Sequence, residues 1–277
     1  MTLVNLAQVL EPARRVGRGL AAFNVIQIEH AEAFAAAAEK VSLPVVMQIS
    51  ENCVRYHGSL APIAAATLAI ADACHQPVVV HLDHAEDAGL VEEAVRLGLT
   101  SVMYDGSRLS DGANRAETRR VVGLCRAHGV SVEAELGEVG GKDGVHAPGV
   151  RTDPGEAARF VADTGVDALA VAVGSSHAMT ERTAQLDTEL IAALRHSVPV
   201  PLVLHGSSGV ADEGLAAAVR AGMTKVNIAT HLNQVFTRAV LDRLENAPTV
   251  DTRKYLGAAR DAVADEAARL MRLLATA

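Results

Sequence analysis

Three histidines stand at or just past the ends of short apolar runs of this sequence: His84, His177 and His205. Neutral imidazoles that converge from different parts of a fold can bind a divalent cation, and three of them with a fourth position left open are typical of a catalytic zinc site. A single histidine in such a place is more often structural, but three at equivalent places favour a shared role. The sequence therefore predicts a catalytic metal site formed by these side chains.

Four acids occupy comparable places. Asp83 precedes the first of these histidines, Asp105 follows the next apolar run, and Glu133 and Glu135 alternate within SVEAELGEVGG (131–141), so they share one face of a strand. A buried carboxylate without a partner costs several kcal/mol. Because we identify no basic residue within the apolar runs to pair with them, we expect the acids to orient ligand histidines, to offer a second metal position, or, for Asp83, to act as an acid/base group. A buried ion pair is the structural alternative.

The elements that must position these residues follow a regular alternation. Short apolar runs rich in β-branched residues predict buried parallel strands, and they cover 21–25, 44–50, 77–82, 99–104, 130–136, 166–173, 199–205 and 224–229. Helical patterns lie between them, several ending at a glycine, over 29–41, 60–75, 86–97, 112–128, 155–164, 187–196, 212–221 and 231–245. The tail, 252–275, predicts one or two further helices.

Eight such units within 277 residues predict an α/β fold, a (β/α)8 TIM barrel with extra C-terminal helices, in which residues 1–277 form one domain. A doubly wound open sheet is the alternative, but the first unit, AAFNVIQIEH, lacks the glycine-rich dinucleotide turn that usually opens it. A barrel builds its active site at the carboxyl ends of its strands. The polar residues that end each run, Asn24 and Gln48 among them, are therefore expected to meet there.

Two turns rich in glycine and hydroxyl groups, HGSSG (205–209) and NIAT (227–230), follow the last two predicted strands and lead into helices. Many barrels bind phosphate at this place, through backbone N–H groups and a helix N-terminus. A metal beside a phosphate site predicts chemistry on a phosphorylated carbonyl compound.

Composition narrows the class of protein. The net charge of −8 argues against nucleic-acid and anionic-membrane partners, and no apolar run approaches the roughly 18 residues of a membrane span. Three cysteines without metal-type spacing, and a start that lacks the pattern of a signal peptide, predict reduced thiols in a cytoplasmic protein.

Six stretches jointly resemble the class II, metal-dependent ketose-bisphosphate aldolases, in order along nearly the whole chain. They are HLDHAED (81–87), SVMYDGS (101–107), SVEAELGEVGG (131–141), VAVGSSHAM (171–179), LVLHGSSG (202–209) and KVNIAT (225–230). The resemblance implies reversible cleavage of a ketose 1,6-bisphosphate, first of all fructose 1,6-bisphosphate, to dihydroxyacetone phosphate and glyceraldehyde 3-phosphate, as in glycolysis. Tagatose 1,6-bisphosphate or another phosphorylated ketose is the alternative substrate. The resemblance also implies a homodimer or homotetramer.

The resemblance assigns roles residue by residue. It implies that His84, His177 and His205 bind catalytic Zn²⁺, which stabilises the enediolate, and that Asp83 exchanges a proton with the C4 oxygen. Asp105 and Glu135 resemble residues that hold a second or displaced metal, and Ser50 matches a contact to the aldehyde half. The implied dihydroxyacetone phosphate site comprises Gly206, Ser207, Ser208, Asn227, Ile228, Ala229 and Thr230, with a monovalent cation (Na⁺ or K⁺) near the phosphate.

A Schiff-base mechanism is not expected. The two lysines nearest the predicted barrel, Lys142 and Lys225, lie in a loop and at a strand start. Neither place predicts the desolvated strand-end position that activates a nucleophilic lysine.

The sequence departs from the family pattern at several points. Ala178 replaces the usual glycine after the second ligand histidine, and GGKDG leaves Asp143 as the nearest loop acid for the C3 proton. NIAT in place of NIDT favours a tagatose-type enzyme or an unassigned branch. Arg151 or Arg182 could meet a second phosphate, and either could equally be a surface charge.

Two other functions are weighed against the aldolase. A metal-dependent hydrolase on the same barrel commonly carries a His-x-His pair on its first strand, and AAFNV has no histidine. A non-catalytic subunit predicts an incomplete ligand set, yet all three histidines are present.

Overall fold

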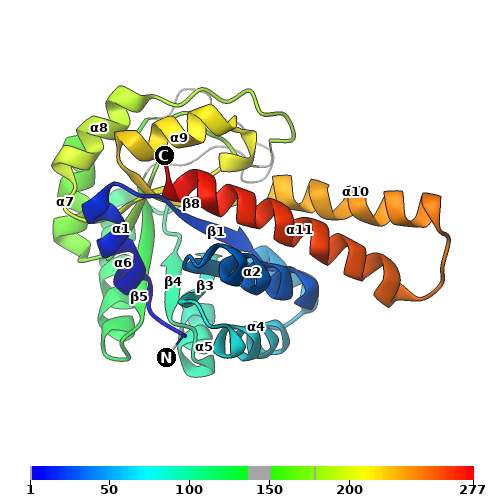
Figure 1. Ribbon diagram of the computed structural model, residues 1–277. Helices are drawn as coiled ribbons and strands as arrows, with labels where there is room; N and C mark the ends of the chain where they lie inside the picture. Colours follow the sequence, from blue (N-terminus) through cyan, green and yellow to red (C-terminus); the bar gives the residue numbers. More distant parts are fainter. Residues whose placement is uncertain (1, 137–150, 178) are drawn as a thin grey trace.

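Eight parallel strands form a closed barrel in the order of the chain, and β8 pairs with β1 to complete it. The computed structural model describes residues 2–136, 151–177 and 179–277 (Figure 1). The strands are β1 (Leu20–Asn24), β2 (Val45–Ser50), β3 (Val78–Ala85), β4 (Ser101–Tyr104), β5 (Ser131–Leu136), β6 (Ala168–Val171), β7 (Leu202–Leu204) and β8 (Met223–Ile228). This confirms the predicted (β/α)8 barrel.

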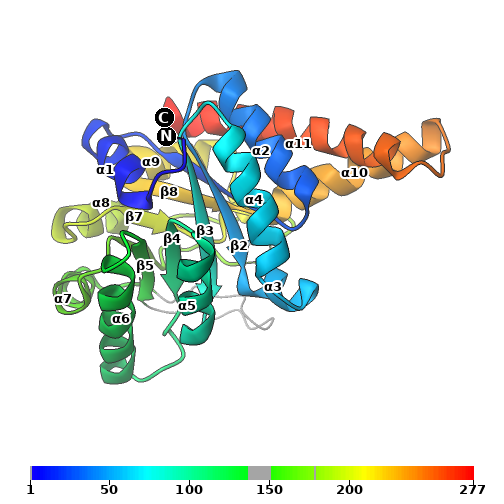
Figure 2. The same ribbon diagram turned by 90° about the horizontal axis from the view of Figure 1, so that it is seen from below.

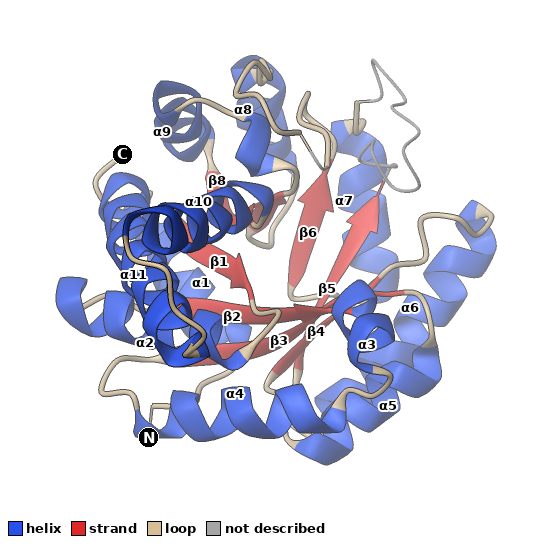
Figure 3. Ribbon diagram, turned by 90° about the vertical axis from the view of Figure 1, so that its right-hand side faces the viewer, coloured by secondary structure: helices blue, strands red, loops and turns tan. Residues whose placement is uncertain are grey.

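Helices surround the strands (Figure 3). They are α1 (Leu6–Val16), α2 (Ile28–Val41), α3 (Glu51–His57), α4 (Ala61–Ala73), α5 (Ala88–Leu97), α6 (Asp111–Arg126), α7 (Pro154–Thr164), α8 (Thr188–Ser197), α9 (Asp212–Ala221), α10 (Thr230–Asn246) and α11 (Thr252–Ala275). The predicted tail is a single helix, α11. It forms with α10 a hairpin whose far end projects beyond the barrel (Figure 1). Two helices, α1 and α3, were not predicted.

Local signals explain why the predicted helices begin and end where they do. The side chains of Asp87, Asp153 and Asp187 each accept a hydrogen bond from a backbone N–H in the first turn of the helix that follows. Gly98 and Gly165 end α5 and α7 in the left-handed conformation, with φ of 91° and 72°, which a glycine adopts without steric cost.

Helix α1 closes the amino end of the barrel. Asn5 and Gln8 form a reciprocal capping box at its start. Its buried side chains pack against residues of the strands in one apolar cluster, which we call the amino-end core: Leu6, Val9, Leu10, Leu20, Ala22, Val46, Val79, Ala168, Ala170 and Val203. Figure 2 shows α1 near the tails of the strands, whereas α3 lies beyond the tip of β2.

None of the helices in the described part of the chain combines the length and the hydrophobicity that spanning a bilayer requires.

Candidate metal and substrate site

The strand faces that supply the amino-end core become polar toward the carboxyl ends. Side chains alternate with a period of two, so Leu20 and Ala22 of β1 share a face with Asn24, and Val46 of β2 shares one with Gln48. The buried or half-buried polar residues at these positions are Asn24, Gln48, His81, Asp83, Glu133, Glu135, His205, Lys225 and Asn227. Predicted site residues thus gather at the carboxyl end of the barrel.

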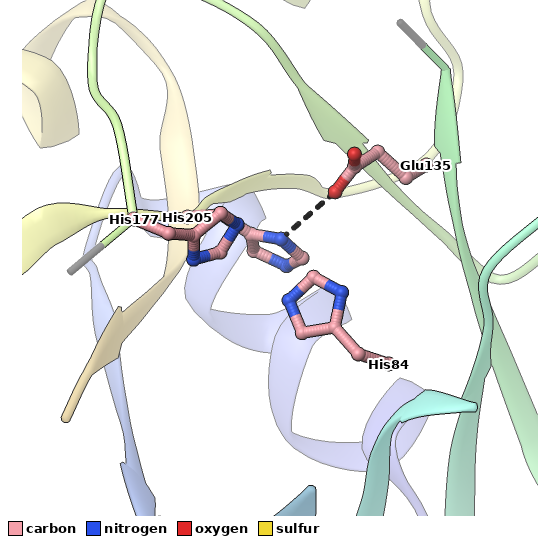
Figure 4. A group of neighbouring side chains, drawn as sticks. All are labelled: His84, Glu135, His177 and His205. Carbon is pink, nitrogen blue, oxygen red and sulfur yellow. Dashed lines mark hydrogen bonds and ion pairs between the residues drawn. The ribbon is translucent and has the colours of Figure 1, made fainter. Parts of the chain in front are cut away.

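Four side chains converge there, each offering one ligand atom within 4.8 Å of the others: His84, Glu135, His177 and His205 (Figure 4). The ring centroids lie 4.7 Å apart for His84 and His205, 5.0 Å for His84 and His177, and 5.6 Å for His177 and His205. They come from β3, β5 and the segments that follow β6 and β7. Three imidazoles and one carboxylate are a donor set that suits zinc.

A backbone irregularity turns His84 toward this group. His84 has a φ of 51°, and among the described residues only Ser42 is another non-glycine with a positive φ. The register of β3 with β4 shifts between Leu82 and Ala85 at the same place. Such irregularities redirect side chains. Asp83 and His84 are neighbours and would face opposite sides of a regular strand, but both line the same pocket.

Asp105 lies behind His84 rather than within the four-residue group. Its Oδ2 lies 2.9 Å from His84 Nδ1, and its Oδ1 accepts from the Ser107 hydroxyl at 2.6 Å. A carboxylate in this position fixes the orientation of the imidazole and leaves Nε2 available to a metal ion.

His205 has a glutamate at each ring nitrogen. Nδ1 lies 3.1 Å from Glu135 Oε2, and Nε2 lies 3.0 Å from Glu133 Oε1. Burial alone would lower the pKa of His205, but its two glutamate partners raise it to about 9. A metal ion that bound at Nδ1 would therefore displace a proton.

Lys225 corrects two expectations from the sequence. It is fully buried, and its Nζ donates to Glu133 Oε2 at 2.8 Å. A basic residue does lie within the strands, therefore, and it is desolvated. The strand period explains this, because Lys225 shares the interior face of β8 with Asn227 and lies deeper in the barrel. Burial opposes ionisation of Glu133, but Lys225 and His205 hold its pKa well below the usual range. Because the ammonium is paired, Lys225 remains a poor candidate for a nucleophile.

His81 completes this buried group. Its Nδ1 lies 2.8 Å from the Ser101 hydroxyl, and its Nε2 lies 3.9 Å from Glu133 Oε2. Burial and Lys225 lower the pKa of His81 to about 3, so this imidazole is neutral beside the ion pair.

Asp83 is held by two carboxamides that the sequence placed at strand ends without a role. Its Oδ2 accepts from Asn24 Nδ2 at 3.2 Å and from Gln48 Nε2 at 3.3 Å. Burial alone would raise the pKa of Asp83, but His84 and Lys225 lower it. Oδ1 has no hydrogen-bond partner in the described structure. An oriented carboxylate with a free oxygen can exchange a proton with a substrate hydroxyl.

The pocket beside these residues encloses about 170 Å³. Its described lining is Asn24, Gln48, Ser50, Asn52, Asp83, His84, His177, Gly206, Ser207, Ser208, Asn227, Ala229 and Thr230. Seven of the eight predicted substrate contacts are in this set, and the eighth, Ile228, is buried in β8. No lysine or arginine occurs among these described lining residues.

One side of the pocket has backbone features that suit an anion. Gly206 has a φ of 66°, and a Cβ there would lie 2.5 Å from the Ser176 backbone, so a side chain is excluded. The Ser208 hydroxyl accepts from the backbone N–H groups of Ala229 and His231, at 3.3 and 3.2 Å. Helix α10 begins here, and its N-cap residue, Ala229, has no side chain that could cap it. Backbone N–H groups and a helix N-terminus suit a phosphate.

The remaining predicted residues lie elsewhere. Arg182 donates to the Val210 carbonyl at 2.8 Å and pairs with Asp212 at 2.5 Å, and it does not line the pocket. Arg151 lies beside Gly174, where a Cβ would be 3.3 Å from its guanidinium. Asp143 and Ala178 lie outside the described residues.

The chain is similar to known proteins in both sequence and structure. A model of the class-II fructose-bisphosphate aldolases matches residues 4–277. The structure resembles the YdjI aldolase from Escherichia coli K12, with 30% identity, a TM-score of 0.88 and coverage of 98% of this chain and 97% of that one. It also resembles a putative fructose-1,6-bisphosphate aldolase from Coccidioides immitis, at 28% identity, a TM-score of 0.85 and coverage of 98% and 97%. The fold is shared with the fructose-bisphosphate aldolase from Campylobacter jejuni, at 22% identity, a TM-score of 0.83 and coverage of 98% and 95%.

Proposed function

Because the chain belongs to the class-II fructose-bisphosphate aldolase family, and is therefore an aldol-cleaving lyase, we propose that its site cleaves a phosphorylated ketose between C3 and C4. The products are dihydroxyacetone phosphate and an aldehyde. The observation that carries this proposal is the convergence of three imidazoles beside a pocket with an anion-binding wall.

We propose that Zn²⁺ binds to His84, His177 and His205, with Glu135 as a further or alternative ligand. The chemistry of the four donors supports this choice of metal. When bound, zinc would act as a Lewis acid and stabilise the negative charge that bond cleavage leaves on the dihydroxyacetone phosphate half.

The other residues divide the remaining tasks. Asp83 takes the C4 hydroxyl proton during cleavage and returns it during condensation. The turn Gly206–Ser208 and the segment Asn227–Thr230 hold the phosphate, and Ser50 contacts the aldehyde half. Its hydroxyl accepts from the Cys53 backbone N–H at the start of α3, which fixes its direction. C3 must also gain a proton, and Asp143 is the nearest acid in the loop that follows β5.

Two substrate classes are proposed. The resemblance in sequence favours a ketose 1,6-bisphosphate, with fructose 1,6-bisphosphate first and tagatose 1,6-bisphosphate as the alternative. The second class is a ketose 1-phosphate, because the described lining residues include no lysine or arginine that could pair with a second phosphate.

The test is a cleavage assay of fructose 1,6-bisphosphate, tagatose 1,6-bisphosphate and fructose 1-phosphate, coupled to detection of dihydroxyacetone phosphate. We expect turnover of at least one sugar, loss of turnover with a chelator, recovery with zinc, and no inactivation by borohydride. Turnover that persists after complete removal of metal would contradict the proposed mechanism.

Three further properties are proposed from the same resemblance: assembly as a homodimer or homotetramer, a Na⁺ or K⁺ ion near the phosphate, and a cytoplasmic location. Light scattering measures the first, and the dependence of turnover on the monovalent salt measures the second.

A further inference from the structure

The buried ion pair beneath the proposed metal site contains no atom placed to react with a substrate. Glu133 and Lys225 are fully buried, and neither lines the pocket. Desolvating two charges costs several kcal/mol per ion. Because the Glu133–Lys225 pair lies directly behind His205, it is placed to influence the geometry of the proposed metal site.

Glu133 links the pair to His205. Its Oε1 lies 3.0 Å from His205 Nε2, and its Oε2 accepts from Lys225 Nζ at 2.8 Å. Each carboxylate oxygen therefore has one directed partner, and the plane of the carboxylate is fixed. With Nε2 directed at Glu133, Nδ1 is the nitrogen that faces Glu135 and the other two imidazoles.

We infer that Glu133 is a positioning residue, which orients His205 so that Nδ1 is its metal-binding atom, and that Lys225 holds Glu133 in place. This inference rests on the proposed metal site. A carboxylate behind a ligand histidine fixes its tautomer and its ring orientation, and loss of such a partner commonly weakens metal affinity by about 10–100-fold.

The experiment separates positioning from a purely structural role. Glu133→Leu leaves the Lys225 ammonium buried without a counter-charge and removes the acceptor that faces His205 Nε2, so we expect a lower Tm as well as weaker zinc binding. The double variant Glu133→Leu/Lys225→Met removes both charges, and the acceptor that faces His205, at similar volume. Its Tm should return toward that of the wild type, while its zinc affinity, measured by competition with a chromophoric chelator, stays about 10–100-fold weaker.

Glu133→Asp provides a second route if the double variant does not fold. It keeps the charge opposite Lys225 but withdraws the carboxylate from His205 by one methylene, so zinc affinity should fall while the fold is retained. The visible spectrum of the cobalt-substituted protein should change in each Glu133 variant, because the orientation of His205 changes. Lys40→Met, which removes an exposed ion pair with Asp265, is the matched control and should leave zinc affinity unchanged.

Wild-type zinc affinity and an unchanged cobalt spectrum in a folded Glu133 variant would overturn the inference. Recovery of affinity together with Tm in the double variant would also overturn it, because that result identifies a structural role alone. A wild-type protein that takes up no zinc would instead refute the proposed metal site.

Discussion

The same strands build two different interiors at the two ends of the barrel. At the amino end, Leu20, Ala22 and Val46 pack with α1 in a core of small and branched apolar side chains. Two residues further along the same faces, Asn24 and Gln48 hold the Asp83 carboxylate. The strand period forces both sets inward. The comparison shows that stability and chemistry are separated along the barrel axis.

The two ends also differ in how the burial of their side chains affects the free energy of folding. The amino-end core gains from the removal of apolar surface from water. The carboxyl end buries Glu133, Lys225 and Asp83, which cost free energy unless each charge is paired or hydrogen-bonded. We therefore expect substitutions at the carboxyl end to change turnover and substitutions at the amino end to change stability, each with little effect on the other property.

The largest effect is expected at Asp83. Asp83→Ala should reduce kcat by about 10²–10⁴-fold, because a positioned acid/base group contributes that much, while zinc stays bound. Steady-state turnover and metal analysis of the same sample measure both quantities. Intact turnover would show that Asp83 is not the acid/base group.

At the amino end, Leu10→Ala is expected to reduce stability rather than turnover. Leu10 is 1% exposed within the amino-end core, and such truncations cost about 2–5 kcal/mol of unfolding free energy. Urea unfolding measures the loss, and kcat of the folded fraction should be unchanged. A parallel fall in kcat would show that the two ends are not independent.

His30 contrasts with the histidines at the carboxyl end of the barrel, because its imidazole lies in apolar surroundings outside the barrel. It is buried on α2, its ring stacks on Phe236 at 4.9 Å, and neither nitrogen has a hydrogen-bond partner in the described structure. Burial lowers its pKa from 6.5 to about 4. The unfolded chain therefore binds the proton first, and stability is lost as the pH falls from 6.5 toward 4.

The loss attributable to His30 should reach about 3 kcal/mol, and His30→Leu should remove it. Urea unfolding of both proteins at pH 7, 5.5 and 4.5 tests this. Equal losses in the two proteins would show that the pKa of His30 is not depressed.

The smallest effect is expected at the surface. Lys40 and Asp265 form an ion pair at 2.7 Å, with side chains 53% and 74% exposed. Lys40→Met should change the unfolding free energy by less than about 1 kcal/mol, because solvent screens exposed pairs. A larger change in the unfolding free energy would show that this ion pair between α2 and α11 contributes substantially to stability.

Most of the fold could be predicted from the sequence because apolar runs and glycine-ended helices are local signals. All eight strands lie within a few residues of their predicted ranges. Helix α1 was missed although its capping box, Asn5 and Gln8, is a local signal, because the predicted elements began with the first strand. Helix α3 was missed because seven residues directly after a strand give little periodicity.

The site was predicted in its residue types but not in its contacts. Polar residues at strand ends identified the four converging side chains. The ion pair between Glu133 and Lys225 could not be predicted from strand ends, because the two residues are remote in sequence and meet across the barrel interior. The turn of His84 toward the site likewise depends on a register shift between β3 and β4.

The distribution of the four converging ligands along the chain constrains when an ion can be acquired. They come from β3, β5 and the segments after β6 and β7, so no fragment of the growing polypeptide holds the complete set until seven strands have been synthesised. An ion that needs all four side chains can therefore bind only late in synthesis, when most of the barrel strands are present. This contrasts with zinc fingers, in which ligands close in sequence let the ion drive folding.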